Sequence, residues 1–314
     1  MNVLLTGAFG NIGTGCLPEL IRQGHRVRAL DLRTPENERA ARQFGEQIEP
    51  AWGDIRDAES VRAAVAGQQA VVHLAAIIPP ESNEKPDLAR AVNVDGTRHV
   101  IQACQQVDPA PRLLFASTFD LFGYTQSQPP PRRVTDPISA TSIYTEHKLA
   151  CEGMVRESGL TWAIFRFADV PLIGLRSAHP IMYEIGLDNR MEVVHHADAG
   201  LAVTNALSCD QVWGQVMLIG GGPDCQVTYR EYVSRILKAM GLEMPPEKAF
   251  SGKEYRTDWL DTEESQRLLT YQRHTFDDIV HEIAGMLGAR RFVLPLIRPL
   301  IQRSMLKLSP YWQD

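Results

Sequence analysis

Tyr144 and Lys148 have the residue types and the spacing that proton transfer requires. Residues four apart share one face of a helix, so the Lys148 ammonium can lie beside the phenol. An unperturbed tyrosine has a pKa of about 10, and a nearby cation favours its phenolate form. We therefore predict that Tyr144 exchanges a proton with a substrate hydroxyl and that Lys148 lowers the pKa of Tyr144. A structural helix with an exposed pair is the alternative.

A glycine-rich turn lies far upstream, at Gly7, Gly10 and Gly13. It follows an apolar strand pattern and precedes a helical one, where helix N–H groups and the helix dipole can bind a pyrophosphate. Glycine permits the close approach of the backbone to phosphates and of the helix to the sheet. The turn predicts a dinucleotide site that also includes Phe9, Asn11 and Ile12. A tight strand–helix turn that binds nothing is the alternative.

Acidic residues close the next two predicted strands. Asp31 can accept hydrogen bonds from ribose hydroxyls and would repel a 2′-phosphate, which favours NAD over NADP. Arg33 lies two residues further on, and its positive charge leaves NADP as an alternative cofactor. For Asp31, the alternative is a solvated carboxylate in a loop. Asp54, followed by Ile55, is placed to accept a hydrogen bond from the adenine amino group. An N-cap of the next helix is the alternative for Asp54.

Short apolar runs alternate with helical patterns over the first 170 residues. We expect strands at 2–5, 26–30, 47–52, 70–74, 112–116 and 161–166, and helices from the glycine turn to residue 23 and at 35–44, 58–66, 88–106 and 142–158. Such alternation is typical of βαβ units with right-handed crossovers and a parallel sheet covered on both faces. The predicted fold class is α/β, a doubly wound parallel (Rossmann) sheet.

The pattern loosens beyond Pro171, where we expect short strands at 192–195 and 215–219 and helices near 199–207, 229–240, 262–269 and 276–287. We assign 1–170, with 193–220 returning to it, to a dinucleotide-binding domain. Residues 171–192 and 221–287 are assigned to a smaller C-terminal substrate-binding lobe, and 288–314 to a basic, apolar tail. The tail can lie on an anionic membrane surface, but we favour packing on its own domain or on a partner subunit. Pro295 and Pro299 are expected to interrupt any early helix.

The bulk composition excludes several classes of protein. A net charge of −6 and a pI near 5.9 argue against a nucleic-acid partner. The apolar N-terminus has no basic region and runs into the glycine turn, so we interpret it as a strand rather than a signal peptide. No apolar run reaches the roughly 18 residues of a transmembrane helix. Five scattered cysteines predict reduced thiols in a cytoplasmic protein.

An ordered series of motifs extends this pattern: TGAFGNIG at 6–13, VVHLAA at 71–76, NVDGT at 93–97, ASTFDLFG at 116–123, YTEHK at 144–148, RFADV at 166–170 and HHAD at 195–198, followed by a C-terminal element at 259–271. Over about residues 1–287 the series resembles the extended short-chain dehydrogenase/reductases, a group that includes nucleotide-sugar epimerases and dehydratases. The resemblance implies an NAD-dependent enzyme, with Lys148 also bonding the nicotinamide ribose. It also implies a homodimer formed through the helix of Tyr144.

The same resemblance assigns further site residues. Thr118 stands where the family has the hydroxyl that orients the substrate oxygen, and neighbouring Ser117 could substitute if the register shifts. Tyr144 and Lys148 are counted among the cofactor contacts as well as the catalytic residues. The other implied cofactor contacts are Leu74, Ala75, Ala76, Asn93 and Phe167.

Departures from the family pattern limit the range of substrates that the site is expected to accept. Phe119 replaces the first of the two acids that dehydratases have after Thr118, which leaves Asp120 alone. Asp169 stands where Asn is usual, and Phe122 where Tyr is usual. The segment from Arg166 to His195 is short and, with Pro171, Arg176, His179 and Arg190, shows no clear diphosphate clamp. A smaller or unusual substrate is therefore plausible.

Histidines raise the question of a metal site. His195, His196 and Asp198 are the best candidates, but a strand end followed by a helix N-cap is the interpretation that we favour, so no metal is predicted. His73 is expected to be structural, and His147 to lie on a helix surface.

These observations predict an oxidoreductase that moves a hydride between a secondary alcohol or ketone and NAD, with NADP also open, and with Tyr144 as the acid/base. A redox-neutral epimerase, which acts on a sugar or nucleotide sugar with tightly bound NAD, is the first alternative. A non-enzymatic dinucleotide-sensing or scaffold protein on the same fold is the second. The partner expected in the first two cases is a small-molecule substrate.

Overall fold

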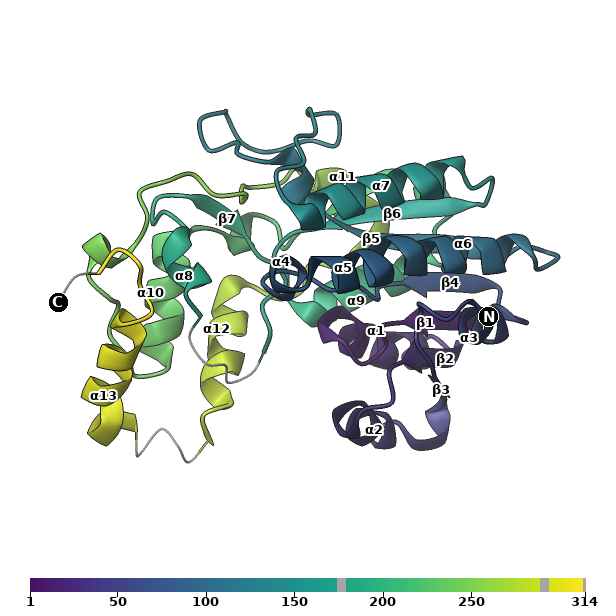
Figure 1. Ribbon diagram of the computed structural model, residues 1–314, viewed down its shortest axis with the longest axis horizontal. Helices are drawn as coiled ribbons and strands as arrows, with labels where there is room; N and C mark the ends of the chain where they lie inside the picture. The colour runs from purple at the N-terminus through teal and green to yellow at the C-terminus, as the bar shows by residue number, and fades with distance from the viewer. Residues whose placement is uncertain (174–178, 289–293, 313–314) are drawn as a thin grey trace.

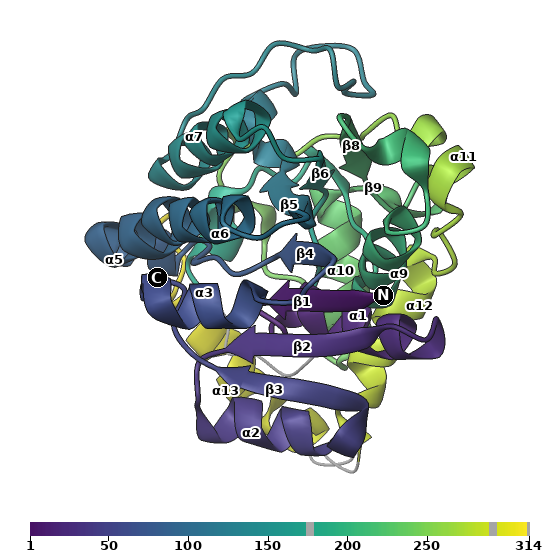
Figure 2. The ribbon, with the colours of Figure 1, turned by 90° about the vertical axis from the view of Figure 1, so that its right-hand side faces the viewer.

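A seven-stranded parallel sheet forms the centre of the computed structural model, which describes residues 1–173, 179–288 and 294–312. The strand order is β3-β2-β1-β4-β5-β6-β8, and every pairing is parallel (Figure 2). Its strands are β1 (Asn2–Thr6), β2 (Arg26–Asp31), β3 (Ile48–Trp52), β4 (Ala70–His73), β5 (Arg112–Thr118), β6 (Trp162–Phe167) and β8 (Val216–Ile219). The order reverses between β1 and β4, as in a doubly wound fold, so the predicted fold class is confirmed.

Helices cover both faces of this sheet (Figure 2). One face packs mainly on α1 (Asn11–Arg22), α2 (Pro35–Arg42) and α9 (His196–Ala206), and the other on α3 (Ala58–Val65), α6 (Gly96–Gln105) and α7 (Ile143–Glu157). Strand residues alternate between the two cores, since Val3 and Leu5 join the first and Leu4 joins the second. This double burial explains why the central strands β1 and β4 contain continuous apolar runs rather than an alternating pattern.

The region predicted as one helix at 88–106 is helical but not uniform. It consists of α5 (Pro86–Arg90), a π-helical turn at Ala91–Asp95 and α6, preceded by the short α4 (Glu81–Glu84). The π turn contains Asn93, and such turns are frequent at functional sites.

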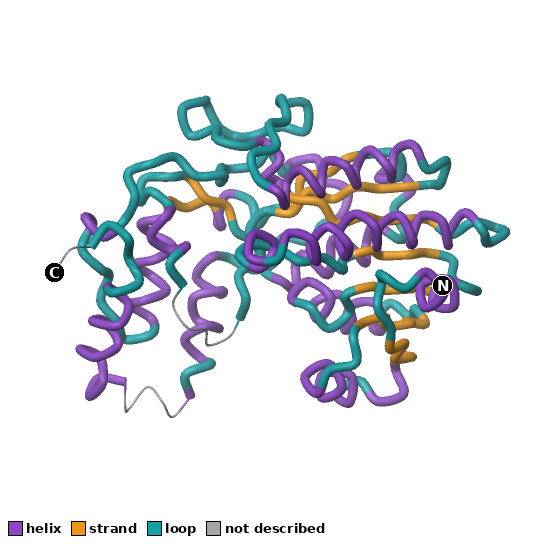
Figure 3. Tube along the Cα trace, viewed as in Figure 1, coloured by secondary structure: helices purple, strands orange, loops and turns teal. Residues whose placement is uncertain are grey.

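A smaller lobe lies at the other end of the molecule (Figures 1 and 3). It contains α8 (Ile181–Glu184), α10 (Tyr229–Ala239), α12 (Phe276–Gly285), α13 (Leu294–Leu306) and the antiparallel pair β7 (Arg190–Glu192) and β9 (Gln226–Thr228); α11 (Glu263–Leu269) packs instead near β8. The strand that we predicted at 192–195 is found two to three residues earlier, as β7. Val193 makes only a single bridge to Asp169, and His195 caps α9.

The tail packs on this lobe, as we favoured. Tyr183 donates its hydroxyl hydrogen to the backbone oxygen of Met305 over 2.9 Å, and Ile301 and Met305 join the lobe core. The expectation that proline would interrupt the helix is wrong, because α13 contains Pro299. The burial on its inner face offsets the one backbone hydrogen bond that a proline removes. Arg290 and Arg291 lie outside the described residues.

Candidate active site

The glycine turn joins β1 to α1 at the carboxyl edge of the sheet. Gly7 has a φ of +67°, and a Cβ there would lie 2.9 Å from the Ala75 backbone. A Cβ on Gly13 would lie 2.4 Å from the Gly7 oxygen. Gly10 is the N-cap of α1 and supplies no side-chain cap, so the first N–H groups of the helix are left for another acceptor.

The residues between these glycines tie the turn to its neighbours. The Phe9 N–H donates to Asp31 Oδ2 over 2.9 Å, and Asn11 Nδ2 donates to the Val170 oxygen over 2.8 Å. Ile12 is partly buried against the core. The ends of β2 and β6 are therefore held directly on the candidate cofactor turn.

The predicted adenosine residues lie at the ends of β2 and β3. Burial raises the pKa of Asp31, although hydrogen bonds from Phe9 and Leu32 oppose the rise. Arg33 is exposed and pairs with Glu38. The preference of this site for NAD over NADP stays a prediction.

Asp54 is not the N-cap of the next helix, so the alternative that we gave for this residue is wrong. Its carboxylate accepts from the backbone and the guanidinium of Arg56, whereas Asp57 caps α3. Asp54 is exposed enough to contact a ligand, while Ile55 is buried against Gly96.

The segment after β4 is held by side chains of the NVDGT motif. Asn93 Oδ1 accepts from the Ile77 N–H (2.7 Å) and Asn93 Nδ2 donates to the Ile77 oxygen (2.9 Å). Asn93 therefore positions the loop after β4, and its contact with the cofactor stays a prediction. Leu74, Ala75 and Ala76 remain partly exposed next to the glycine turn.

His73 has the structural role that we predicted. Its Nδ1 lies 2.7 Å from the Thr6 hydroxyl and its Nε2 lies 3.0 Å from the Thr97 hydroxyl, which itself donates to the Asn93 oxygen. Burial, with a smaller effect of Lys148, lowers the pKa of His73 to about 3. The imidazole is therefore neutral and links β1 to α6.

Tyr144 and Thr118 meet at the end of β5. Ser142 and Thr145 form a capping box that starts α7, so Tyr144 is fixed in the first turn. Burial raises the pKa of Tyr144, the charge of Asp120 adds to the rise, and a hydrogen bond with the Thr118 side chain opposes it.

Lys148 does not have the effect on Tyr144 that we predicted. Its Nζ donates to the Ala116 oxygen over 2.6 Å and lies 4.8 Å from the centre of the Phe115 ring, against 5.9 Å for the Tyr144 ring. Burial lowers the pKa of Lys148 to about 8. The expectation of a lowered Tyr144 pKa is therefore wrong, because burial raises this pKa.

Ser117 faces away from Tyr144, into a buried ion pair. Its hydroxyl donates to Glu152 Oε1 over 2.7 Å, and the Arg166 guanidinium donates to both oxygens of Glu152 at 2.9 and 2.8 Å. The register does not shift, so Thr118 is the candidate hydroxyl and Ser117 is structural. Phe167, the last residue of β6, is buried and pairs with Thr118 in the sheet.

Two carboxylates adjoin Tyr144. Burial raises the pKa of Asp120 to about 6, and burial together with the Asp120 charge raises the pKa of Asp169 to about 8. Two residues that no sequence motif indicates lie near these acids: Arg256 opposes the rise in the Asp120 pKa, and burial together with the charges of Asp120 and Asp169 raises the pKa of Tyr255. These two residues lie in a charge-rich linker without periodicity, so only the fold reveals them.

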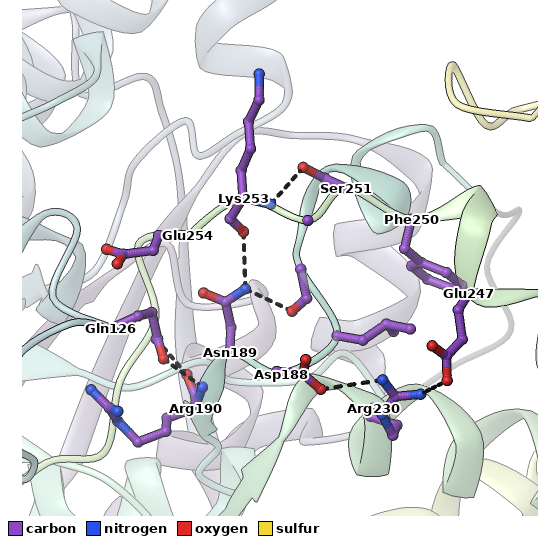
Figure 4. A pocket seen from close by; sticks show the side chains of 13 residues that line it. Gln126, Asp188, Asn189, Arg190, Arg230, Glu247, Phe250, Ser251, Lys253 and Glu254 are labelled. Carbon is purple, nitrogen blue, oxygen red and sulfur yellow. Dashed lines mark hydrogen bonds and ion pairs between the residues drawn. The ribbon is translucent and has the colours of Figure 1, made fainter.

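A pocket of about 330 Å³ opens in the lobe (Figure 4). Arg230 lies between Asp188 and Glu247, and Lys253 extends away from the other labelled side chains. The Arg190 guanidinium donates hydrogen bonds to Asp258 and to two backbone oxygens. These bonds leave the pocket's two arginines neutralised within the protein, which agrees with the missing diphosphate clamp. Arg176 lies outside the described residues, and His179 accepts from the Ile181 N–H.

The histidine cluster ties α9 to the lobe. Potential ligand atoms of His195, Asp198 and His274 lie within 4.8 Å of one another. His195 Nδ1 accepts from the Ala197 N–H, as the predicted N-cap requires, and its Nε2 lies 2.7 Å from Glu282. Asp198 is already bonded to the ring and backbone of His274, and the two imidazoles stack at 4.1 Å. Stacked rings with engaged nitrogens suit a structural tie better than a metal.

Two other predictions concern buried side chains. His147 is buried rather than on the surface, and its Nδ1 has no hydrogen-bond partner. All five cysteines are free, and four are buried, with Cys209 half-buried.

Within the described residues, no helix has the length and apolarity that crossing a membrane demands.

Known proteins resemble this chain in sequence and in structure. Sterol demethylase protein B of Methylococcus capsulatus is 32% identical over 123 residues, which cover 39% of this chain and 36% of that protein. D-erythronate dehydrogenase of Cupriavidus necator is 30% identical over 135 residues, 39% of this chain and 40% of that protein. The chain thus matches about two fifths of the length of these curated relatives.

The structural likeness extends over nearly the whole chain. UDP-glucuronic acid 4-epimerase of Bacillus cereus, solved with a UDP-sugar analogue and NAD, superposes with a TM-score of 0.78 at 17% identity, covering 92% of this chain and all of that chain. Residues 3–171 match the family model described as "NAD dependent epimerase/dehydratase family", which is more than half of the chain. The chain therefore belongs to the NAD-dependent epimerase/dehydratase family.

Proposed function

We propose that this protein is an oxidoreductase that interconverts a secondary alcohol and a ketone with NAD. The observation that carries the proposal is the placement of Tyr144, in the first turn of α7, near Thr118 at the carboxyl end of β5, on the same sheet edge as the glycine turn. A phenol and a hydroxyl that share one ligand oxygen can orient it and exchange its proton.

The residues of the turn fit a dinucleotide. The uncapped N-terminus of α1 offers N–H groups and a positive dipole end to a pyrophosphate. Asp31, held by the Phe9 N–H, is placed for ribose hydroxyls, which favours NAD. Further candidate contacts are Asp54, Leu74, Ala75, Ala76, Phe167 and Lys148. When bound, NAD supplies the hydride acceptor or donor.

In the oxidative direction, Tyr144 first gives up its own proton, and its phenolate then accepts the hydroxyl proton as the hydride leaves the carbinol carbon, which yields a ketone. In the reductive direction, Tyr144 returns the proton to the ketone oxygen. Because burial raises its pKa, Tyr144 holds its proton at neutral pH, as the reductive direction requires. Thr118 holds the substrate oxygen in both directions.

Several observations support a substrate other than a nucleotide sugar. Arg190 is neutralised by Asp258, and the two curated relatives are named for sterol demethylation and for D-erythronate, neither of which is a nucleotide sugar. The structural likeness to an epimerase supports the fold alone.

The test is the formation of NADH from NAD and a panel of secondary alcohols, followed by absorbance. The proposal predicts free NADH with at least one alcohol. Reduced nucleotide that stays on the protein and appears only after denaturation would select the redox-neutral alternative. No reduction in either fraction contradicts the proposal.

A homodimer through α7 belongs to this proposal. Ile143 and Leu149 on this helix are more than one-third exposed, so they are available to a second copy. Sedimentation equilibrium should give twice the mass of 35.1 kDa, and a monomer at micromolar concentration would contradict this part.

A further inference from the structure

Asp120 and Asp169 reach the same edge of the sheet from neighbouring strands. β5 and β6 are parallel, and Thr118 and Phe167 form their last registered pair. Each acid lies two residues beyond that pair. The Asp120 N–H donates to the Thr118 hydroxyl oxygen over 3.2 Å, which sets Asp120 directly beside the catalytic hydroxyl.

Asp169 is rigidly held through its backbone but not through its carboxylate. Its N–H donates to the Glu192 oxygen (3.3 Å), and its oxygen accepts from the Val194 N–H (2.8 Å). Its side-chain Oδ2, by contrast, is shielded from solvent and has no hydrogen-bond partner. An unpaired buried polar atom costs about 1–3 kcal/mol, so a donor supplied by a ligand would be favourable.

The surroundings of the pair limit the charge of such a donor. Arg256 stabilises the charged form of Asp120 and donates from Nη2 to the Tyr255 hydroxyl over 3.2 Å. Two close carboxylates hold one proton between them near neutral pH, and the electrostatic effects of Asp120 and Asp169 reach both Tyr144 and Tyr255. One remaining negative charge faces one arginine, so an uncharged hydroxyl fits better than an ammonium.

We propose that Asp169, supported by Asp120, binds a second hydroxyl of the substrate on the carbon next to the reacting one. The inference rests on the proposed function, in which Tyr144 and Thr118 hold the reacting oxygen. It assigns the substrate to the vicinal diols, and the product to the α-hydroxy ketones, rather than to alcohols with one isolated hydroxyl. It makes Asp169 a residue that determines specificity.

The test compares cis-1,2-cyclohexanediol with cyclohexanol, each titrated calorimetrically into the full-length protein saturated with NADH. We expect the wild type to bind the diol at least about 10-fold more tightly, since pairing a buried polar atom that otherwise has no hydrogen-bond partner accounts for that factor. Asp169→Ala should bring the two affinities within about twofold of each other without weakening cyclohexanol. Asp169→Asn keeps an oxygen acceptor and should retain most of the preference.

Asp224→Ala is the control, because it makes the same substitution at an exposed aspartate. Melting temperatures report whether each variant is folded. Equal affinities of the wild type for the two alcohols, or an unchanged preference in Asp169→Ala, overturn the inference. 2-Aminocyclohexanol binding more tightly than the diol overturns the choice of a hydroxyl. Failure to bind NADH at all would instead overturn the proposed function.

Discussion

The cofactor side and the substrate side of the site differ in how their polar groups are satisfied. On the cofactor side, Asp31 holds the Phe9 N–H, and Asn93 holds both polar groups of Ile77. On the substrate side, Asp169 Oδ2 and Arg256 Nε are buried without hydrogen-bond partners.

The difference indicates which half depends on a ligand for completion. Buried polar groups are normally paired, so a paired network is preformed and an unpaired one awaits a partner. Substitutions on the cofactor side should therefore affect folding and nucleotide binding together. Substitutions on the substrate side should change turnover and selectivity with less effect on folding.

The largest effect is expected for Tyr144→Phe, which removes only the hydroxyl that exchanges the proton. We predict that kcat falls by roughly 10²–10⁴, with an unchanged melting temperature and unchanged NADH affinity. Steady-state NADH formation with the best alcohol of the panel measures it. Full turnover would show that Tyr144 is not the acid/base.

Gly13→Ala should damage both folding and cofactor binding. Its Cβ would lie 2.4 Å from the Gly7 oxygen and 2.5 Å from the Ala8 oxygen, so the turn must shift. We expect a loss of about 3 kcal/mol in the free energy of unfolding and weaker NADH binding in fluorescence titrations. Gly153→Ala, also helical but with open space around its Cβ, is the matched control and should be neutral or stabilising. Equal behaviour of the two variants would contradict the crowding.

Arg190→Ala tests whether this cation in the lobe is structural. Arg190 Nε donates to Asp258 Oδ1 over 2.7 Å, and Asp258 is buried. Losing this partner should cost about 2 kcal/mol by chemical denaturation, against less than about 1 kcal/mol for the exposed pair removed by Arg39→Ala. If Arg190→Ala kept its stability but lost affinity for UDP-glucose, Arg190 would be a diphosphate ligand instead.

Asp31→Asn tests the nucleotide preference of the cofactor side. Removing the charge while keeping an acceptor for Phe9 should shift the NADPH-to-NADH affinity ratio by about 10-fold towards NADPH, because repulsion of the 2′-phosphate is lost. Asp224→Asn provides the charge-matched control. An unchanged ratio would leave Arg33 as the determinant.

The smallest effect concerns His73 and pH. Its folded pKa, about 3, is below the unfolded value, so the folded state binds fewer protons and stability is lost as pH falls below about 6.5. We expect the free energy of unfolding to drop by about 1 kcal/mol between pH 7 and pH 5.5 from this residue. Denaturation curves of the wild type and of His73→Asn should show a steeper slope in the wild type, and parallel slopes would contradict the assignment.

The sequence predicts best those features that depend on local chemistry. The glycine turn, the alternation of strands and helices, the N-cap at His195 and the structural role of His73 are confirmed because each follows from neighbouring residues or from a motif. Features set by packing between distant segments differ. The Lys148 ammonium turns to Ala116, and His147 is buried.

The substrate side could not be assembled from the sequence for the same reason. Asp120, Asp169 and Arg256 come from three segments separated by 49 and 87 positions. Asp169 was visible only as a departure from a family pattern, and no pattern marks Arg256. Their meeting depends on the register of β5 and β6 and on the path of the linker before α11.

Transfer of deuterium from a labelled diol to the nucleotide shows whether the protein oxidises a vicinal diol with NAD. cis-1,2-Cyclohexanediol, deuterated at both carbinol carbons, is incubated with the protein and NAD, and all nucleotide is released by denaturation for mass spectrometry. We expect reduced nucleotide that carries one deuterium from the wild type, and no reduced nucleotide from Tyr144→Phe. Unlabelled NADH, or no reduced nucleotide in the wild type, would contradict it.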